Sequence, residues 1–204
     1  MSVAEFCGIL FGDGKITPSK EKGYRIAIWF NMVEREYMKE VKTLVIKHFQ
    51  ITPSLYFNLD KSVYCMQFFS KELVLRLLSL GVPTNHKNDM VIPLWILKDE
   101  SAVRDYLRGL FDTDGCITYQ RDKGYIYPLI KFTMKSKKFA FSVRNALQSL
   151  GLRAYTCKKG RTGFDVVIRN KESINYWITN IGCRNATKRE KVRGINPLSG
   201  DTGI

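Results

Sequence analysis

Two aspartates, Asp13 and Asp114, each close an apolar segment and are each followed by glycine. The segments, residues 6–14 and 107–115, lie 101 positions apart and share a glycine-spaced pattern. If they lie side by side in the fold, the two carboxylates meet, and carboxylates that close repel unless a proton or cations lie between them. Divalent cations held between acids are the arrangement of metal-assisted phosphodiester hydrolysis.

Both segments are typical of the last turns of a helix that runs into a turn. Apolar residues fill them, and Gly14 or Gly115 marks where the chain leaves helical geometry. Small residues recur four positions apart on one helix face: Gly8 with Gly12, and Gly109 with Thr113. Two such faces can pack with little side chain between the backbones, which would bring the two aspartates together at the end of the shared interface.

The repeat extends beyond the two segments, because the same shift aligns Lys22-Gly23-Tyr24 with Lys123-Gly124-Tyr125. Hydrophobic periodicity predicts a short strand, a longer strand, a helix, a second hairpin and a final helix after each segment. The predicted later elements are helices at 34–49, 71–80, 135–150 and 171–181, with hairpins at 55–69 and 153–169. The predicted boundaries are an N-terminal half at 1–92, a linker at 93–100, a C-terminal half at 101–193 and a flexible tail at 194–204.

With two such motifs, the chain resembles the LAGLIDADG homing endonucleases, specifically the single-chain, two-motif kind that introns encode. The resemblance covers the chain from about residue 3 to about residue 190. It implies an α+β monomer of two pseudo-twofold αββαββα halves whose antiparallel sheets form a DNA-binding saddle. It also implies a site-specific endonuclease that hydrolyses both strands of a long pseudo-palindromic double-stranded DNA target with a divalent metal and leaves 3′ overhangs.

The metal-binding residues expected from the motifs are Asp13, Asp114 and the main-chain carbonyls of Gly12 and Thr113. Oxygen ligands without histidine or cysteine suit Mg²⁺, for which Mn²⁺ can substitute. In the family, the same motif position supplies the metal-binding acid of each half, so the resemblance implies that both aspartates are catalytic.

Two lysines, Lys87 and Lys188, each follow their aspartate by 74 residues. The resemblance implies that such a lysine approaches the active site and polarises the attacking water or the phosphate. Further polar residues around the metal are expected at Asn31, Thr133 and Lys135.

Residues adjacent to the motif aspartates differ between the copies. The second copy has Asp112 where the first has Phe11, a position that in the family packs and does not bind metal. Arg108 replaces a small residue and is expected to point outward or to contact DNA.

The expected DNA-contacting residues lie on one face of each predicted sheet, because alternate strand residues point to opposite faces. One face packs on helices, and the other can enter the major groove, where polar side chains contact base edges. The predicted contacts are Arg25, Trp29, Asn31, Tyr56, Asn58, Tyr125, Tyr127, Lys131, Arg153, Tyr155, Asp165 and Arg169.

The composition agrees with a nucleic-acid partner, because 33 Lys and Arg outnumber 19 Asp and Glu and give a net charge of +14. No stretch reaches the roughly 18 to 20 apolar residues of a membrane span, and no signal peptide is evident, which predicts a soluble, intracellular protein in a prokaryotic cytoplasm or an organelle. The 5 cysteines are scattered and odd in number, so neither a disulfide framework nor a zinc site is indicated.

Two alternatives use the same fold. The chain could be a maturase that binds intron RNA, or a regulator that binds DNA without cutting it. The intact acid in both copies favours the nuclease over both alternatives. A third alternative is a basic scaffold protein of a ribonucleoprotein, which would leave the paired aspartates without an explanation.

Overall fold

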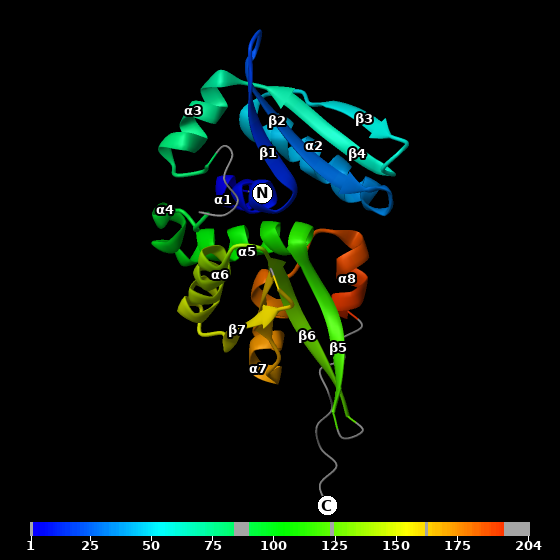
Figure 1. Cartoon of the computed structure of the whole chain (residues 1–204), viewed down its shortest axis with the longest axis vertical. Coiled ribbons are helices and arrows are strands. Elements are labelled where there is room, and N and C mark those ends of the chain that lie inside the picture. Colours follow the sequence, from blue (N-terminus) through cyan, green and yellow to red (C-terminus); the bar gives the residue numbers. More distant parts are fainter. Residues whose placement is uncertain (1, 84–89, 123–124, 162, 194–204) are drawn as a thin grey trace, which may run out of the picture.

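The computed structural model describes residues 2–83, 90–122, 125–161 and 163–193, and it has two similar halves stacked on each other (Figure 1). The elements of the N-terminal half are α1 (Val3–Asp13), β1 (Gly14–Ser19), β2 (Gly23–Asn31), a 3₁₀ turn at Met32–Glu34, α2 (Arg35–Phe49), β3 (Ser54–Asn58), β4 (Val63–Phe69) and α3 (Lys71–Ser79). The elements that follow are α4 (Leu94–Leu97), α5 (Glu100–Asp114), β5 (Gly115–Asp122), β6 (Tyr125–Met134), α6 (Lys137–Ser149), β7 (Ala154–Lys159), β8 (Gly163–Ile168), α7 (Lys171–Tyr176), a π-helical turn at Trp177–Ile181 and α8 (Ala186–Arg193). The predicted α+β class with two αββαββα halves is confirmed.

Each half contains one four-stranded antiparallel sheet. The strand orders are β1-β2-β4-β3 and β5-β6-β8-β7. The inner strands are therefore β2 and β4 in the first sheet, and β6 and β8 in the second. Asn31 lies opposite Val63 in the first sheet, and Thr133 lies opposite Asp165 in the second. In each sheet, this register determines to which face the side chain of each strand residue points.

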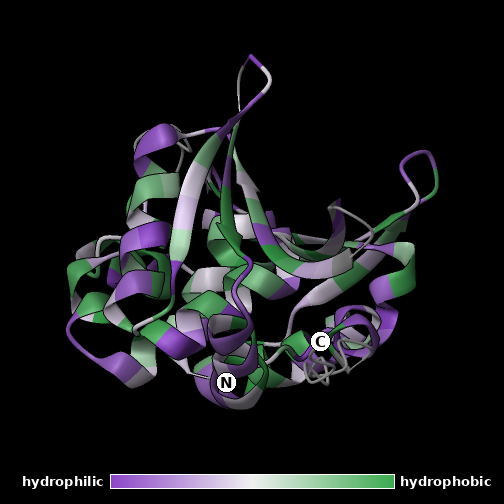
Figure 2. Cartoon of the chain, turned by 90° about the horizontal axis from the view of Figure 1, so that it is seen from below, coloured by the Kyte–Doolittle hydropathy of each residue, from purple (hydrophilic) through white to green (hydrophobic). Residues whose placement is uncertain are grey.

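The inner face of each sheet packs against helices, as the alternation predicted. Ile26, Ile28 and Phe30 of β2 are at most 2% exposed, and Phe132 of β6 is fully buried. Figure 2, a view from below, shows the strands extending to one side of the molecule and the helices gathered on the other. We call the sheet face that is not covered by helices the open face.

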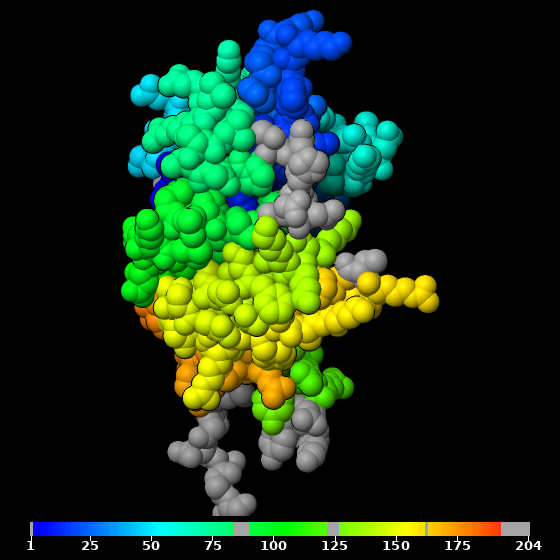
Figure 3. Space-filling model, turned by 60° about the vertical axis from the view of Figure 1, so that its left-hand side comes forward, coloured from blue at the N-terminus to red at the C-terminus, as the bar shows by residue number. Residues whose placement is uncertain are grey.

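The helices α1 and α5 lie between the halves, and we call them the motif helices (Figure 1). Figure 3 shows the two halves in continuous contact, with the β1–β2 hairpin and the β7–β8 hairpin projecting from the body. One buried hydrophobic cluster includes residues from both halves. None of the helices in the described part is long and apolar enough to cross a membrane.

Three features were absent from the sequence prediction. The short helix α4 lies within the predicted linker at 93–100, and α5 already begins at Glu100. The last predicted helix of the C-terminal half changes to a π-helical turn at Trp177. Finally, α8 is an additional helix, and the predicted tail at 194–204 lies outside the described residues.

Candidate active site at the ends of the motif helices

Each motif helix ends on its aspartate and passes directly into a strand. Ser2 caps the start of α1 by accepting from the Glu5 backbone N–H at 3.2 Å, and Asp99 caps α5 by accepting from the Ser101 backbone N–H at 2.8 Å. After the aspartates, Gly14 and Gly115 have extended backbone, with φ of −91° and −80°.

These two glycines are needed for space and not for a left-handed backbone. A Cβ atom on Gly14 would lie 2.5 Å from the Leu10 Cα, and one on Gly115 would lie 2.7 Å from the Phe111 Cα. Each strand therefore starts close against the last turn of the helix that precedes it. This tight connection fixes the direction in which the aspartate points.

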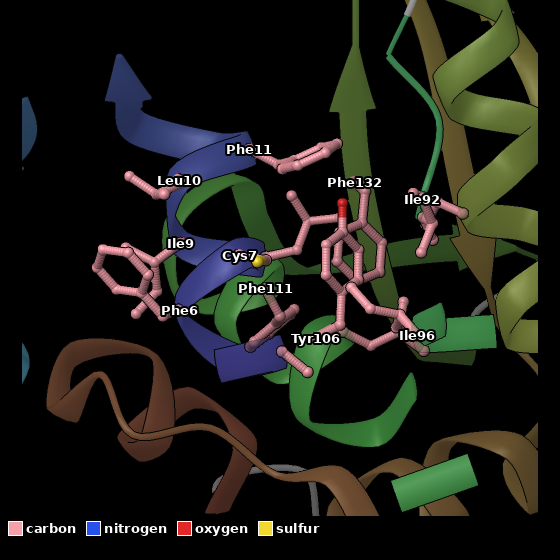
Figure 4. Close-up of a cluster of buried hydrophobic side chains, with 14 of the residues drawn as sticks. Phe6, Cys7, Ile9, Leu10, Phe11, Ile92, Ile96, Tyr106, Phe111 and Phe132 are labelled. Carbon is pink, nitrogen blue, oxygen red and sulfur yellow. The ribbon is translucent and has the colours of Figure 1, made fainter. Parts of the chain in front are cut away.

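The motif helices cross at glycines, as the small-residue spacing predicted. A Cβ atom on Gly8 would lie 2.8 Å from the Leu110 backbone nitrogen and would clash with the Tyr106 carbonyl. A Cβ atom on Gly109 would clash with the Glu5 carbonyl in the same way. Figure 4 shows Cys7 and Tyr106 where the two helices lie side by side. The backbones meet without intervening side chains, so the helix ends come close together.

The predicted metal-binding residues lie together where the motif helices end. Asp13 is half-buried and Asp114 is exposed. A Cβ atom on Gly12 would lie 3.5 Å from the Asp114 carboxyl carbon and would clash with the Thr113 hydroxyl. The acid of the C-terminal half therefore packs on the motif end of the N-terminal half, which brings Gly12, Thr113 and Asp114 into one site.

Lys188 reaches the same helix end from α8. Its ammonium donates to the Phe111 carbonyl at 2.8 Å and to the Thr113 carbonyl at 2.6 Å. Burial lowers the pKa of Lys188, and the nearby carboxylates of Glu34, Asp112, Asp13 and Asp114 oppose that shift only in part. The predicted lysine is thus held at the end of α5, where both aspartates act on it electrostatically, whereas Lys87 lies outside the described residues.

The residues fit a hard divalent cation in their chemistry. Two carboxylates and main-chain carbonyls are the oxygen ligands that Mg²⁺ and Mn²⁺ accept. The Thr113 carbonyl already accepts from Lys188, but a carbonyl oxygen has two lone pairs, so one remains for a metal. Within the residues that the structure describes, no group of three or more His, Cys, Asp and Glu could hold a metal, so the remaining ligands of such a cation would be water or substrate oxygens.

Asp112 is a buried acid that sequence reasoning treated as packing only. It is 1% exposed, and its carboxylate accepts from the backbone N–H groups of Arg184 and Asn185 at 3.0–3.1 Å. Burial raises the pKa of Asp112 to about 7, although these two N–H groups act in the opposite direction. Asp112 therefore anchors the chain segment that leads into α8.

The prediction for Arg108 was wrong. Instead of pointing outward, Arg108 donates both from Nε and from its terminal nitrogen to the Glu5 carboxylate, each at 2.9 Å, and it pairs with Asp105. Arg184 donates to the same carboxylate at 2.6 Å. Glu5 is fully buried, so an arginine with a long side chain can pair inward with an acid of the other half. Sequence pattern alone could not show a partner 103 residues away.

The three other polar residues expected near the metal have different surroundings. The Asn31 side chain accepts from the Val33 backbone N–H at 3.2 Å and caps the 3₁₀ turn. Thr133 donates to Asp165 at 2.7 Å, and Lys135 is an exposed residue directly after β6. Their predicted role around a metal stays a prediction.

The predicted DNA-contacting residues of the N-terminal half share the open face of the first sheet. Arg25, Trp29 and Asn31 alternate along β2, and Tyr56 and Asn58 lie on β3 with side chains on the same face. Arg25 donates to the Tyr56 hydroxyl at 3.3 Å, and Asn58 accepts from the Lys61 backbone N–H at 3.1 Å.

In the C-terminal half, a polar cluster covers the open face of the second sheet. Lys131 pairs with Asp165 at 3.5 Å, and Lys159, which the sequence reasoning did not select, donates to Thr133 at 3.3 Å. Asp165 is only 9% exposed, because these neighbours surround it. Lys159 lies on the same face of β7 as Tyr155, four residues away. It is a basic residue on the open face, and the alternation of strand residues in the sequence could have selected it.

The remaining predicted contacts lie at the rim of this face. Tyr127 and Tyr155 are 40% and 39% exposed, and the Arg169 guanidinium lies 5.8 Å from the centre of the Tyr155 ring. Arg153 is exposed directly before β7. The side chain of Tyr125 lies outside the described part of the chain.

Part of the chain matches a known domain family, and two longer proteins share parts of its sequence. A family model described as a LAGLIDADG-like domain matches residues 101–182. The probable cell division protein WhiA of Limosilactobacillus reuteri is 29% identical over 120 residues, which are 58% of this chain and 37% of that protein. The replication factor C small subunit of Methanocaldococcus jannaschii is 25% identical over 204 residues, 95% of this chain and 10% of that protein. The chain therefore spans little more than a third of the length of the first of these curated relatives and a tenth of the second.

Solved structures match nearly the whole chain. The LAGLIDADG meganuclease I-AabMI bound to uncleaved DNA superposes with a TM-score of 0.66 at 10% identity, covering 95% of this chain and 88% of that one. The homing endonuclease I-DmoI in complex with DNA and Ca superposes with a TM-score of 0.65 at 15% identity, covering 94% and 96%. At such identities the likeness shows the fold. Residues 101–182 therefore match the LAGLIDADG-like domain family, and the chain as a whole has the fold of the single-chain LAGLIDADG homing endonucleases.

Proposed function

We propose that the protein is a site-specific DNA endonuclease that uses divalent metal to cut both strands of a long pseudo-palindromic target and leaves 3′ overhangs. The chain would act as a monomer, because both motif helices and both sheets belong to one polypeptide. The DNA-bound state of I-AabMI and I-DmoI and the net charge of +14 support double-stranded DNA as the partner.

The convergence of Asp13, Asp114 and Lys188 at one point carries this proposal. The motif helices pack backbone against backbone, so the two acids at their ends lie close enough to need a positive charge between them. A scaffold protein would not explain this pair of acids. Asp13 and Asp114 would hold Mg²⁺, or Mn²⁺ in its place, and such a metal would supply an activated water and neutralise charge on the phosphate. I-DmoI has been seen with DNA and Mn, which supports divalent metal use here.

The protein's own residues would then orient the reactants. Lys188, held in place by two carbonyls, presents a cation beside the aspartates and can stabilise charge on the scissile phosphate. By its matching spacing, Lys87 would act in the other half. The open faces of the two sheets would contact the bases on either side.

Cleavage of a randomised-site DNA library with Mg²⁺ tests the proposal. We expect discrete cut sites with the wild type, and a loss on the order of 10²-fold or more with Asp13→Asn or Asp114→Asn, because each removes a carboxylate that would hold the divalent cation. Asp99→Asn is the matched control, since it makes the same substitution at the opposite end of α5, where asparagine caps equally well.

The alternatives predict different results in the same assays. Tight, salt-sensitive DNA binding without cleavage in Mg²⁺ or Mn²⁺ would replace the nuclease with the regulator. Preference for structured intron RNA over DNA would favour the maturase.

A further inference from the structure

The start of α8 is bonded to the end of the motif helix α5. The backbone N–H groups of Arg184 and Asn185 donate to the buried Asp112 carboxylate, and the Asn185 side chain donates to the Asp112 carbonyl at 3.0 Å. These hydrogen bonds hold Arg184 and Asn185, the two residues directly before α8, against the end of α5.

The same asparagine also reaches the other half of the molecule. Asn185 is fully buried, and its side-chain nitrogen donates to Glu34 at 2.7 Å. Its oxygen accepts from the backbone N–H and the hydroxyl of Thr187, at 3.2 Å and 2.7 Å, and so caps the first turn of α8. One side chain therefore links α8, α5 and the N-terminal half.

Lys188 follows Asn185 by three residues, in the first turn of α8. Its ammonium donates to the carbonyls of Phe111 and Thr113, in the last turn of α5, and lies over the Phe111 ring at 5.7 Å. A lysine side chain has many rotamers, so the position of its ammonium depends on how firmly the helix that carries it is held.

The N-terminal half lacks the parts from which this arrangement is made. At the positions 101 residues earlier, Phe11 replaces Asp112 and Pro83 replaces Arg184. Phenylalanine offers no acceptor and proline has no backbone N–H to donate. The carboxylate acceptor and one of its two backbone donors are thus missing from the sequence of the N-terminal half.

We propose that Asn185 is a positioning residue that, with Asp112 and Glu34, holds Lys188 at the end of α5, by a set of residues that the sequence of the N-terminal half does not repeat. The inference rests on the proposed nuclease function for its catalytic consequence. The placement of Lys188 itself can be tested without any cleavage.

Lysine acetylation, followed residue by residue with mass spectrometry, measures that placement. Asn185→Ser keeps a helix cap but removes both side-chain donors. We expect Lys188 to react slowly in the wild type and on the order of tenfold faster in Asn185→Ser, because its anchoring bonds are loosened. Lys191, exposed on the same helix, is the internal control and should not change. Glu34→Ala cuts the same link from the other half and serves if Asn185→Ser does not fold.

The catalytic consequence is measured on supercoiled plasmid carrying the selected target. Asn185→Ser should slow cleavage of one strand on the order of 10- to 100-fold while DNA affinity stays unchanged, so that nicked circles accumulate. Ser142→Ala is the matched control, because Ser142 accepts a partly buried hydrogen bond from the Ile92 backbone N–H at 2.9 Å and is not among the residues bonded to Lys188.

The outcomes separate the two proposals. Equal Lys188 reactivity in wild type and variants overturns the positioning role, and so does slowing of both strands to the same extent. If the wild type cuts no DNA while the variants still expose Lys188, the nuclease function fails and the structural link around Asn185 stands.

Discussion

At the scale of single residues, Gly8 and Gly109 decide how closely the halves approach. Each lies against backbone atoms of the opposite motif helix, and neither has a positive φ that would itself require glycine. The residue type is explained by contact alone.

Gly8→Ala should therefore destabilise the protein. In a free helix interior this change gains about 1 kcal/mol of stability, whereas overpacking here is expected to cost about 1–3 kcal/mol. The urea midpoint and the free energy of unfolding, measured by circular dichroism, check the sign. A gain in stability would show that the helices do not meet at this residue.

Glu5 is the buried acid that both interface arginines share. Burial would raise its pKa, but the hydrogen bonds and charges of Arg108 and Arg184 outweigh burial and lower it below the ordinary 4.5. A carboxylate with a lowered pKa stabilises the folded state above its unfolded value, and that contribution is lost as the pH falls through the folded value.

Glu5→Gln should accordingly cost stability in a pH-dependent way. Near pH 7 the loss is expected to be about 3 kcal/mol, the low end for a broken buried pair, because Arg184 stays 36% exposed. Urea unfolding at a series of pH values should show wild type and variant converging below pH 4.5. A difference that stays constant with pH would contradict the assigned pairing.

The sequence predicts some residues of the site but not those whose role depends on distant partners. Asp13 and Asp114 could be selected because the motif is repeated, and Lys188 because its spacing is repeated. Asp112, Arg108 and Asn185 act through partners more than 70 positions away, and only the fold brings those partners together.

At the scale of elements, the strands and long helices were predictable because one face of each is apolar. The helix α8 was not, because its sequence Ala-Thr-Lys-Arg-Glu-Lys-Val-Arg has almost no apolar periodicity, and within it only Val192 is buried among the residues whose side chains the structure describes. Its stability comes from its cap and from the bonds of Asn185, which is a tertiary cause. The sequence signal that could have predicted α8 was Asn185, a residue type that often caps helices, shortly before a charged stretch.

The second sheet makes a prediction about its open face. Replacing both Lys131 and Lys159 with Gln should reduce the slope of log affinity against log salt by about 1.8, if each contacts one phosphate. Fluorescence anisotropy with target DNA at several salt concentrations measures the slope. Lys39→Gln with Lys47→Gln on α2 removes the same charge from the helical side and should leave the slope nearly unchanged.

At the scale of the whole molecule, the duplication predicted the two halves and their internal symmetry, but not how they differ. The halves share their strand order and their motif geometry. They differ at the interface, where the position of Glu5 in α1 is occupied by Tyr106 in α5, and that of Arg108 by Cys7.

This difference governs which helices can associate. The Glu5 carboxylate and the Arg108 guanidinium satisfy each other only when α1 meets α5. Two copies of the C-terminal half would instead leave each Arg108 with Asp105 of its own helix but without the buried Glu5 carboxylate, to which it donates from two nitrogens. Two copies of the N-terminal half would bury two glutamates without a cation. The two halves thus share their backbone geometry but have complementary charges at the interface, so that α1 and α5 satisfy each other better than either would satisfy a copy of itself.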